Sequence, residues 1–185
     1  PSHHIVAGST RSSLRMDVQK LVKKRGGACQ CIRCREIRGQ AVDHEDLTIR
    51  DMIYYPAHAK EHFLEIVTSK DKLIGYLRLS IPLQIDPGLD IDDLRDAAII
   101  REIHIYGQSI DVGSSLDGAA QHSGFGKTLI EKAKEIASAE GKRRLAVISA
   151  IGTRNYYQAR GFSSGTYYMT IDLDNDDKSE ISNPC

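Results

Sequence analysis

The residues best suited to chemistry form a short glycine-containing segment, Gln121 to Gly126, at the start of a helical pattern. The segment reads QHSGFG, and apolar residues at helical spacing follow it, which predicts a helix that runs to Gly141. Glycines at a helix start let backbone N–H groups approach an anion, and the positive end of the helix dipole favours phosphate there. The sequence therefore predicts a pyrophosphate cradle that includes Gln121, Ser123, Gly124, Phe125, Gly126 and Lys127.

Two common phosphate-binding patterns do not fit this segment. A P-loop ending at Gly126-Lys127-Thr128 would need glycine at position 121, and a dinucleotide-binding fingerprint starting at Gly124 would need glycine or alanine at position 129. The pattern that does fit is [QR]-x-x-G-x-[GA], which resembles the coenzyme A pyrophosphate loop of GNAT acetyltransferases. The alternatives are a plain helix start for the glycines and an ordinary solvated side chain for Lys127.

The elements around this segment support the coenzyme A reading. A strand pattern, Ala98 to Tyr106, precedes it, and another, Arg144 to Ala150, follows the helix. A short helix is predicted from Thr153 to Phe162, with its first residue as the N-cap and Gly161 as the residue after its end. A last strand is predicted from Thr166 to Leu173. This order resembles the coenzyme A-binding half of the GNAT fold.

Three more strand patterns lie earlier in the chain, at Leu47 to Tyr55, Glu61 to Thr68 and Lys72 to Ile81. Only three residues separate the last two, which is typical of a hairpin. An antiparallel meander followed by a strand–helix–strand half predicts an α+β fold with a mixed central sheet and flanking helices. An acidic loop, Pro82 to Asp96, and a second loop, Gly107 to Ala120, are predicted before and after the central strand.

The central strand carries the first candidates for acyl chemistry. In a GNAT fold this strand splays from its neighbour and its backbone pairs with the pantetheine arm, so its residues Glu102, Ile103, His104 and Ile105 are expected at the acyl site. A main-chain N–H near Ile105 is suited to polarising a thioester carbonyl. Glu102 or His104 is a candidate general base. By strand alternation, a residue that faces the site has neighbours that face the other side of the sheet. The alternative is a surface glutamate and a half-buried histidine.

Tyr156 and Tyr157 carry the second set of candidates, on the short helix. A phenol there is suited to hydrogen-bond or protonate a leaving thiolate. Adjacent helical residues point about 100° apart, so one tyrosine is expected to face the coenzyme and the other the core.

Cys29, Cys31 and Cys34 lie within six residues and form a candidate metal site. Three thiols at this spacing can converge on one ion, and zinc is the expected metal. Neighbouring arginines favour the thiolate form. A tetrahedral site needs a fourth ligand, for which His3, His4, His44 and a residue outside this chain stay open, while Cys185 in the polar tail is disfavoured. The alternative is three reduced cysteines in a loop, and the spacing does not match a radical-SAM iron–sulfur motif.

A net charge of zero conceals a basic N-terminal segment. Residues 1–40 hold nine Lys or Arg against Asp17 and Glu36, a net of +7, which leaves −7 for the remainder. Apolar Leu14, Val18 and Leu21 at helical spacing predict a helix over 11–24 with a core face, stopped by glycine at 26. The segment suggests a phosphate-backbone partner, with a solvated basic helix as the alternative. The candidate nucleic-acid contacts are Arg11, Arg15, Lys20, Lys23, Lys24, Arg25, Arg33 and Arg35.

Four segments together resemble the catalytic subunit of Elongator, over roughly residues 1 to 173. They read CQCIRCREIRG from Cys29, EIHIYGQ from Glu102, QHSGFG from Gln121, and ISAIGTRNYYQARGF from Ile148. That family joins a radical-SAM domain to a GNAT-like domain and modifies C5 of the wobble uridine in tRNA with acetyl-CoA as the carbon source. The resemblance favours Tyr157 as the tyrosine at the ligand and tRNA as the partner of the basic segment.

The chain departs from that family in having no CxxxCxxC motif. The resemblance therefore implies a fragment whose iron–sulfur cluster and S-adenosylmethionine would belong to the missing radical-SAM domain. The expected organisation is a basic linker with the cysteine cluster (1–45), an acetyl-CoA-binding domain (46–173) and a polar, disordered tail (174–185). No long apolar run or signal peptide is present, so we expect a cytoplasmic location and no membrane. A protein lysine N-acetyltransferase and a zinc-stapled RNA-binding module without turnover remain the alternatives.

Overall fold

The computed structural model describes residues 8, 13–38, 46–84, 91–106 and 123–173. It divides the chain into two compact units, residues 1–36 and 37–185. The predicted linker boundary at residue 45 lies in a stretch, 39–45, outside the described residues. The predicted loop at 107–120 and the tail after 173 also lie outside them.

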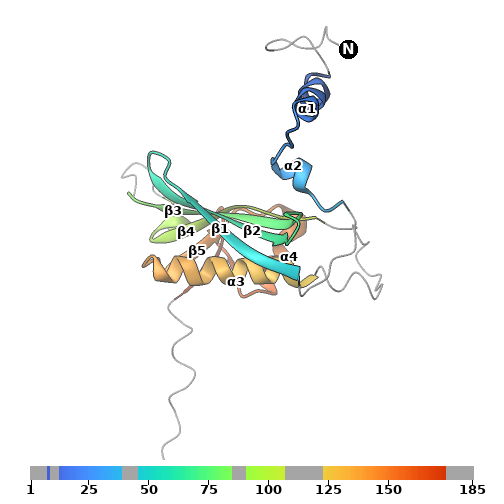
Figure 1. The fold of residues 1–185 in the computed structure, drawn as a ribbon. Coiled ribbons are helices and arrows are strands. Elements are labelled where there is room, and N and C mark those ends of the chain that lie inside the picture. The colour runs from blue at the N-terminus through green and yellow to red at the C-terminus, as the bar shows by residue number, and fades with distance from the viewer. Residues whose placement is uncertain (1–7, 9–12, 39–45, 85–90, 107–122, 174–185) are drawn as a thin grey trace, which may run out of the picture. The chain divides into compact units, whose positions relative to one another are not determined.

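The second unit is built on one mixed sheet, which has seven strands among the described residues (Figure 1). The strand order is β1-β2-β3-β4-β5-β7-β6. The strands are β1 (Leu47–Tyr54), β2 (Ala59–Thr68), β3 (Leu73–Pro82), β4 (Ala97–Ile105), β5 (Arg144–Val147), β6 (Ser163–Ser164) and β7 (Met169–Asp172). The first four strands form an antiparallel meander, β4 and β5 are parallel, and β7 is antiparallel to both β5 and β6. The predicted meander and α+β class are confirmed.

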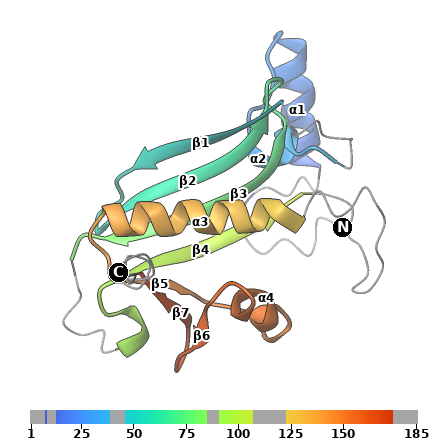
Figure 2. The ribbon, with the colours of Figure 1, turned by 90° about the horizontal axis from the view of Figure 1, so that it is seen from below.

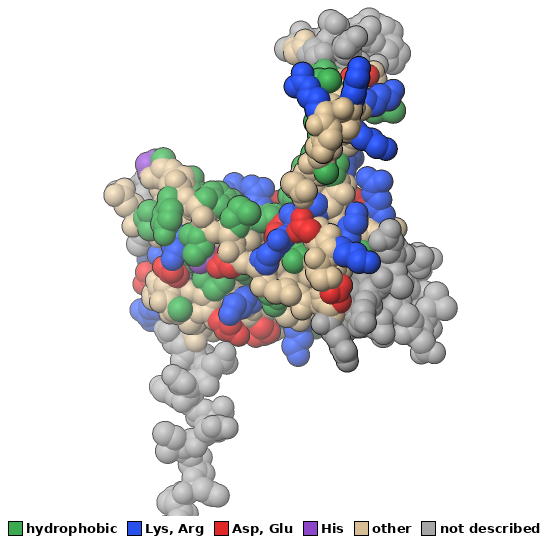
Figure 3. Space-filling view, viewed as in Figure 1, with side chains coloured by type: hydrophobic (Ala, Val, Ile, Leu, Met, Phe, Trp, Pro, Cys, Tyr) green, Lys and Arg blue, Asp and Glu red, His purple; other side chains and the backbone are tan. Residues whose placement is uncertain are grey.

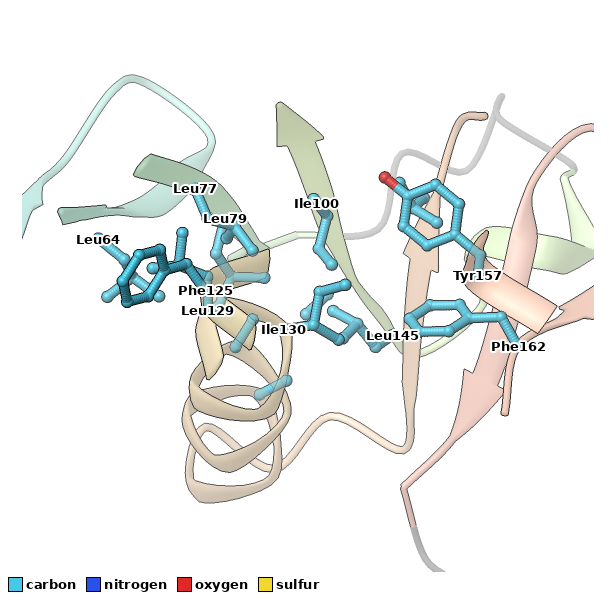
Figure 4. Close-up of a cluster of buried hydrophobic side chains, with 14 of the residues drawn as sticks. Leu64, Leu77, Leu79, Ile100, Phe125, Leu129, Ile130, Leu145, Tyr157 and Phe162 are labelled. Carbon is cyan, nitrogen blue, oxygen red and sulfur yellow. The ribbon is translucent and has the colours of Figure 1, made fainter. Parts of the chain in front are cut away.

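Helix α3 (Ser123–Ala139) packs along one face of this sheet, against β3, β4 and β5 (Figure 2). Its apolar stripe is the one that the sequence predicts, because Leu129, Ile130, Ala133 and Ala137 are completely buried. They meet Leu77, Leu79 and Ile100 of the sheet in a single core (Figure 4). Burial of a leucine or isoleucine side chain of this kind stabilises a fold by about 1.5–3 kcal/mol. This core fixes where the N-terminus of α3 lies relative to β4.

The first unit contains two helices among its described residues, α1 (Leu14–Lys24) and α2 (Ile32–Arg35). Gly26 ends α1 with a φ of 74°, and the N–H of Gly27 donates to the carbonyl of Val22, as the predicted stop requires. The predicted core face of α1 is wrong for the described residues: none of its side chains is buried, and Leu14, Val18 and Leu21 are 44–49% exposed. The physical reason is that the spacing of apolar residues makes a helix face suited to packing but does not supply the element that packs on it.

The predicted strand at Thr166–Leu173 is too long, since β7 begins only at Met169. The cause is Asp93, whose carboxylate accepts hydrogen bonds from the backbone N–H groups of Thr166 (3.2 Å), Tyr167 (2.7 Å) and Tyr168 (3.0 Å). Three successive N–H groups that converge on one carboxylate cannot also point alternately to the two sides of a strand. Asp93 sits on a short 3₁₀ turn, η3 (Asp92–Leu94), within the predicted acidic loop.

Among the described residues, no helix combines the length and the apolar character that crossing a membrane requires.

Candidate functional site

β4 and β5 are paired along only part of β4. Their parallel pairing runs from Ala97–Arg144 to Ile100–Val147, where β5 ends. β4 continues for five more residues, and among the described residues no strand pairs with 101–105 on the β5 side. The predicted acyl-site residues Glu102 to Ile105 lie in this segment. Backbone groups on an open strand edge can pair with an extended ligand, which is what the prediction for this strand requires.

A β-bulge at Arg101 marks the point where the two strands separate. Arg78 of β3 pairs with Glu102 and Leu79 pairs with Ile100, so that Arg101 is the additional residue. A bulge bends its strand and increases the local twist, which turns the end of β4 away from the line of β5. The guanidinium of Arg101 lies 3.1 Å from a carboxylate oxygen of Glu61, a side chain of which only 2% is exposed. This ion pair fixes the bulge to β2.

Helix α3 begins beside this open segment. In its first turn, Gly124 is exposed and a β-carbon there would meet nothing within 4 Å, while Lys127 is exposed. Phe125 is buried in the core and anchors the turn. The first N–H groups of a helix have no partner within the helix, so this turn can bind an anion. Gln121 lies outside the described residues, and Ser123 begins the helix.

Gly126 brings three predicted segments together. A β-carbon on Gly126 would overlap the hydroxyl oxygen of Tyr156 and would lie 3.8 Å from Cγ1 of Ile105. The glycine loop, the short helix and the end of β4 therefore meet at one point, as the predicted coenzyme site requires. A side chain at 126 would therefore displace the Tyr156 hydroxyl.

The two tyrosines lie on α4 (Arg154–Gln158), a helix that follows a 3₁₀ turn, η4 (Ile151–Thr153). The predicted N-cap at Thr153 is not made by its side chain, whose hydroxyl instead donates back to the carbonyl of Ala150. The predicted helix is too long, since α4 ends at Gln158, but the terminating role of Gly161 is confirmed: it has a φ of 86° and the next N–H donates to the carbonyl of Tyr157.

Tyr156 and Tyr157 face different surroundings. Tyr157 is 5% exposed and packs edge-on against Phe162, with centroids 5.6 Å apart. Its hydroxyl points away from Phe162 and Leu145 (Figure 4). Tyr156 is half-buried, and the guanidinium of Arg160 lies 3.4 Å from its ring centroid. Burial raises the pKa of both phenols, so both remain protonated hydrogen-bond donors at neutral pH.

Glu102 and His104 share the sheet face opposite α3, while Ile103 and Ile105 point to the core side. Both carboxylate oxygens of Glu102 are engaged: the Tyr76 hydroxyl donates to one, and Arg78 lies 3.3 Å from the other. Burial, and next the hydrogen bond to Glu102, raise the pKa of Tyr76, so this donor stays protonated. These two contacts hold the Glu102 carboxylate in place on the outer face of the sheet.

His104 is exposed within an aromatic row on the same face. Its ring centroid lies 4.4 Å from that of Tyr106 and 6.0 Å from that of Tyr76. Sequence reasoning did not find Tyr76 or Arg78, because only strand pairing brings them beside β4. It also missed Arg101 of β4, whose partner Glu61 lies on β2.

The three cysteines of the first unit are gathered as a metal site requires. The sulfur atoms of Cys29, Cys31 and Cys34 all lie within 4.8 Å of one another. Ligands at about 2.3 Å from a tetrahedral zinc ion are themselves about 3.8 Å apart, so the three thiols need to move little to share one ion. A hydrogen bond from the Cys29 thiol, followed by the N–H of Cys34 and by Arg15, lowers the pKa of Cys31 to about 6. The soft three-sulfur donor set fits zinc; the fourth-ligand candidates His3, His4, His44 and Cys185 lie outside the described residues.

The predicted nucleic-acid contacts fall in the same unit, where Lys and Arg side chains gather around α1 (Figure 3). Lys20, Lys23, Lys24 and Arg25 are exposed. Arg15 is also a predicted nucleic-acid contact, and in the structure its guanidinium donates to the sulfur atoms of Cys31 and Cys34. Arg11 lies outside the described residues.

The chain belongs to the acetyltransferase (GNAT) family, whose model matches residues 32–162. It is also similar to proteins with a narrower name. It is 36% identical over 180 residues to a tRNA uridine(34) acetyltransferase of Dehalococcoides mccartyi, and 35% identical over 183 residues to Elongator complex protein 3 of Danio rerio. Each match covers 94% of this chain, which spans 39% and 32% of those relatives' lengths.

A solved structure gives the same relationship. The Elp3 protein of the archaeon Methanocaldococcus infernus superimposes with a TM-score of 0.73 at 32% identity, covering 93% of this chain and 42% of that one. The resemblance inferred from the four sequence segments is confirmed.

Proposed function

We propose that this domain binds acetyl-CoA and presents its acyl group for a tRNA-dependent modification at C5 of a wobble uridine. The observation that carries the proposal is the meeting of Gly126, Tyr156 and Ile105 beside the open segment of β4. The names of the relatives, which are uridine(34) acetyltransferases and Elongator subunits, support the tRNA part.

Acetyl-CoA supplies an activated two-carbon unit whose transfer or hydrolysis releases a thiolate. The chain's own groups would contribute at three points. The first turn of α3 would hold the pyrophosphate through backbone N–H groups at the helix start. The open edge of β4 at 101–105 would pair with the extended pantetheine arm and direct an N–H at the thioester carbonyl.

The third contribution would come from α4. A phenol with a raised pKa stays protonated, so Tyr157 or Tyr156 would donate a hydrogen bond or a proton to the departing thiolate. Gly126 would keep the Tyr156 hydroxyl close to the helix start by leaving room for it.

The remaining length of the relatives supports a second active unit. We propose that the radical step, with its iron–sulfur cluster and S-adenosylmethionine, belongs to a radical-SAM domain that works with this one. A structural zinc on the cysteine cluster would hold the first unit together.

The binding test is a calorimetric titration with a non-hydrolysable acetyl-CoA analogue, comparing the parent with Gly124→Val. Because a β-carbon at 124 meets open space, this variant keeps the fold and blocks the phosphates, so we expect affinity to fall at least tenfold. Ser138→Val, at an exposed position in the last turn of α3, is the matched control and should bind as the parent does. Equal affinity for the Gly124 variant would remove the cradle from the proposal.

Acceptor specificity is tested separately. Acetyl-CoA consumption with tRNA, with a lysine-containing peptide and with neither should rise only with tRNA. Stimulation by the peptide would identify a lysine N-acetyltransferase instead. tRNA binding without any turnover would identify an RNA-binding module.

A further inference from the structure

Helix α1 makes contact with the cysteine cluster through two side chains that the metal prediction leaves unused. One nitrogen of Arg15 lies 3.4 Å from Sγ of Cys31 and 3.8 Å from Sγ of Cys34. The side-chain amide of Gln19 donates to Sγ of Cys34 at 3.3 Å. Positions 15 and 19 are four residues apart, so both side chains leave the same face of the helix.

These contacts matter because little else among the described residues can hold α1. None of its eleven residues is buried. A helix of this length is marginal in water on its own, and most helical stability in proteins comes from a packed face. Leu14, Val18 and Leu21 do not supply one here.

The charges of Arg15 and of a metal-bound cysteine cluster are complementary. A divalent ion bound by three thiolates leaves one negative charge on the cluster. The guanidinium of Arg15 offsets that charge, and N–H donors to metal-bound sulfur reduce the repulsion between thiolates. Gln19, one helical turn after Arg15, adds a donor without adding charge.

We propose that Arg15 and Gln19 are positioning residues that fasten helix α1 to the metal-bound cysteine cluster. Metal binding then orders the basic helix, and the helix in turn strengthens metal binding. The inference concerns residues 13–36 alone and does not rest on the proposed acyl transfer.

Zinc affinity is the first test, measured on the full chain by competition with a chromophoric chelator. Arg15→Ala and Gln19→Ala should each weaken zinc binding by about 10- to 100-fold, as is typical for partners of metal ligands. Arg15→Lys should recover part of the loss, because it keeps the charge but not the planar guanidinium whose nitrogen reaches both sulfur atoms. The matched controls are Lys20→Ala and Lys23→Ala, which remove the same charge from exposed positions of the same helix and should bind zinc as the parent does.

Helix order is the second test, and it distinguishes fastening from a general charge effect. Amide hydrogen exchange within 14–24 should slow when zinc is added to chelator-treated parent protein. It should slow much less in Arg15→Ala and Gln19→Ala, even at zinc concentrations that fill the site. Unchanged zinc affinity in both variants, exchange in α1 that ignores zinc, or failure of the parent to bind zinc would each overturn the proposal. Loss of acetyl-CoA binding in the titration described above would leave it intact.

Discussion

The hydroxyl of Tyr156 occupies the space in which a β-carbon on Gly126 would lie. Gly126 is in the first turn of α3 and Tyr156 is on α4, so this contact ties together the two elements that flank the open end of β4. The glycine thus has a role in the protein's own packing besides any approach to phosphate.

That contact predicts a measurable coupling. Gly126→Ala should lower the free energy of unfolding by about 1–3 kcal/mol, the usual cost of overpacking. Removing the hydroxyl with Tyr156→Phe leaves the ring carbon Cζ 3.4 Å from the new methyl group, a tight but tolerable distance. The double variant should therefore recover most of the loss in urea denaturation. Strict additivity of the two changes would contradict the assigned contact.

The raised phenol pKa values lead to a kinetic prediction. Tyr157→Phe keeps the ring that packs on Phe162, so the fold and acetyl-CoA affinity should remain near those of the parent. If its hydroxyl donates to the leaving thiolate, turnover should fall by about 10²- to 10⁴-fold. Tyr156→Phe is the paired control, with a smaller expected loss. The reverse ranking would assign the donor to Tyr156.

The Asp93 carboxylate gives the domain a defined response to acid. Its hydrogen bonds with the N–H of Tyr167, and next of Tyr168, hold the pKa of Asp93 below its usual range. A carboxylate with a lower pKa in the folded state stabilises the fold above the unfolded pKa of about 3.9, and this stability is lost as the pH falls through the folded value. Unfolding measured between pH 6 and pH 2 should show this decline.

Asp93→Asn should weaken that acid dependence and lower stability at neutral pH by about 1.5–3 kcal/mol, the usual range for hydrogen bonds to a charged group. Gly165→Ala should disturb the same clamp, since a β-carbon there would overlap the Asp93 carboxylate. An Asp93→Asn protein with the parent's pH profile would show that the clamp contributes nothing.

The basic helix gives a salt-dependent prediction. Reversing Lys23, Lys24 and Arg25 to glutamate should weaken tRNA binding and flatten its dependence on the logarithm of salt concentration, because fewer counterions are released. Acetyl-CoA affinity should not change, since these residues lie in the other unit. tRNA affinity with the parent's magnitude and salt slope would place the RNA site elsewhere.

Local periodicity predicted most of the fold. The buried stripe of α3 and the alternating meander strands are set by nearby residues, and their bounds agree with the structure to within about two residues. The errors have non-local causes. The late start of β7 follows from Asp93, more than seventy residues earlier in the chain. Leu14 and Leu21 are exposed because helical spacing does not supply a packing partner.

The candidate site likewise contains residues that the sequence predicts and others that only the fold brings together. The glycine loop, the tyrosines and the cysteines are recognisable because each has a characteristic spacing. Tyr76 and Arg78 have none, and they contact Glu102 only because β3 pairs with β4. A sequence pattern cannot show which partners a glutamate acquires across a sheet.

The short pairing between β4 and β5 also has a mechanical consequence. The two halves of the sheet, β1–β4 and β5–β7, are joined by four residue pairs across a seam that ends at Ile100 and Val147. Helix α3 packs on β3, β4 and β5, so it contacts strands on both sides of the seam. Its first turn contains Gly124 and Gly126. A ligand bound by both this turn and the end of β4 would restrict movement between the two half-sheets. The angle between the half-sheets would then set the distance from the α4 tyrosines to β4.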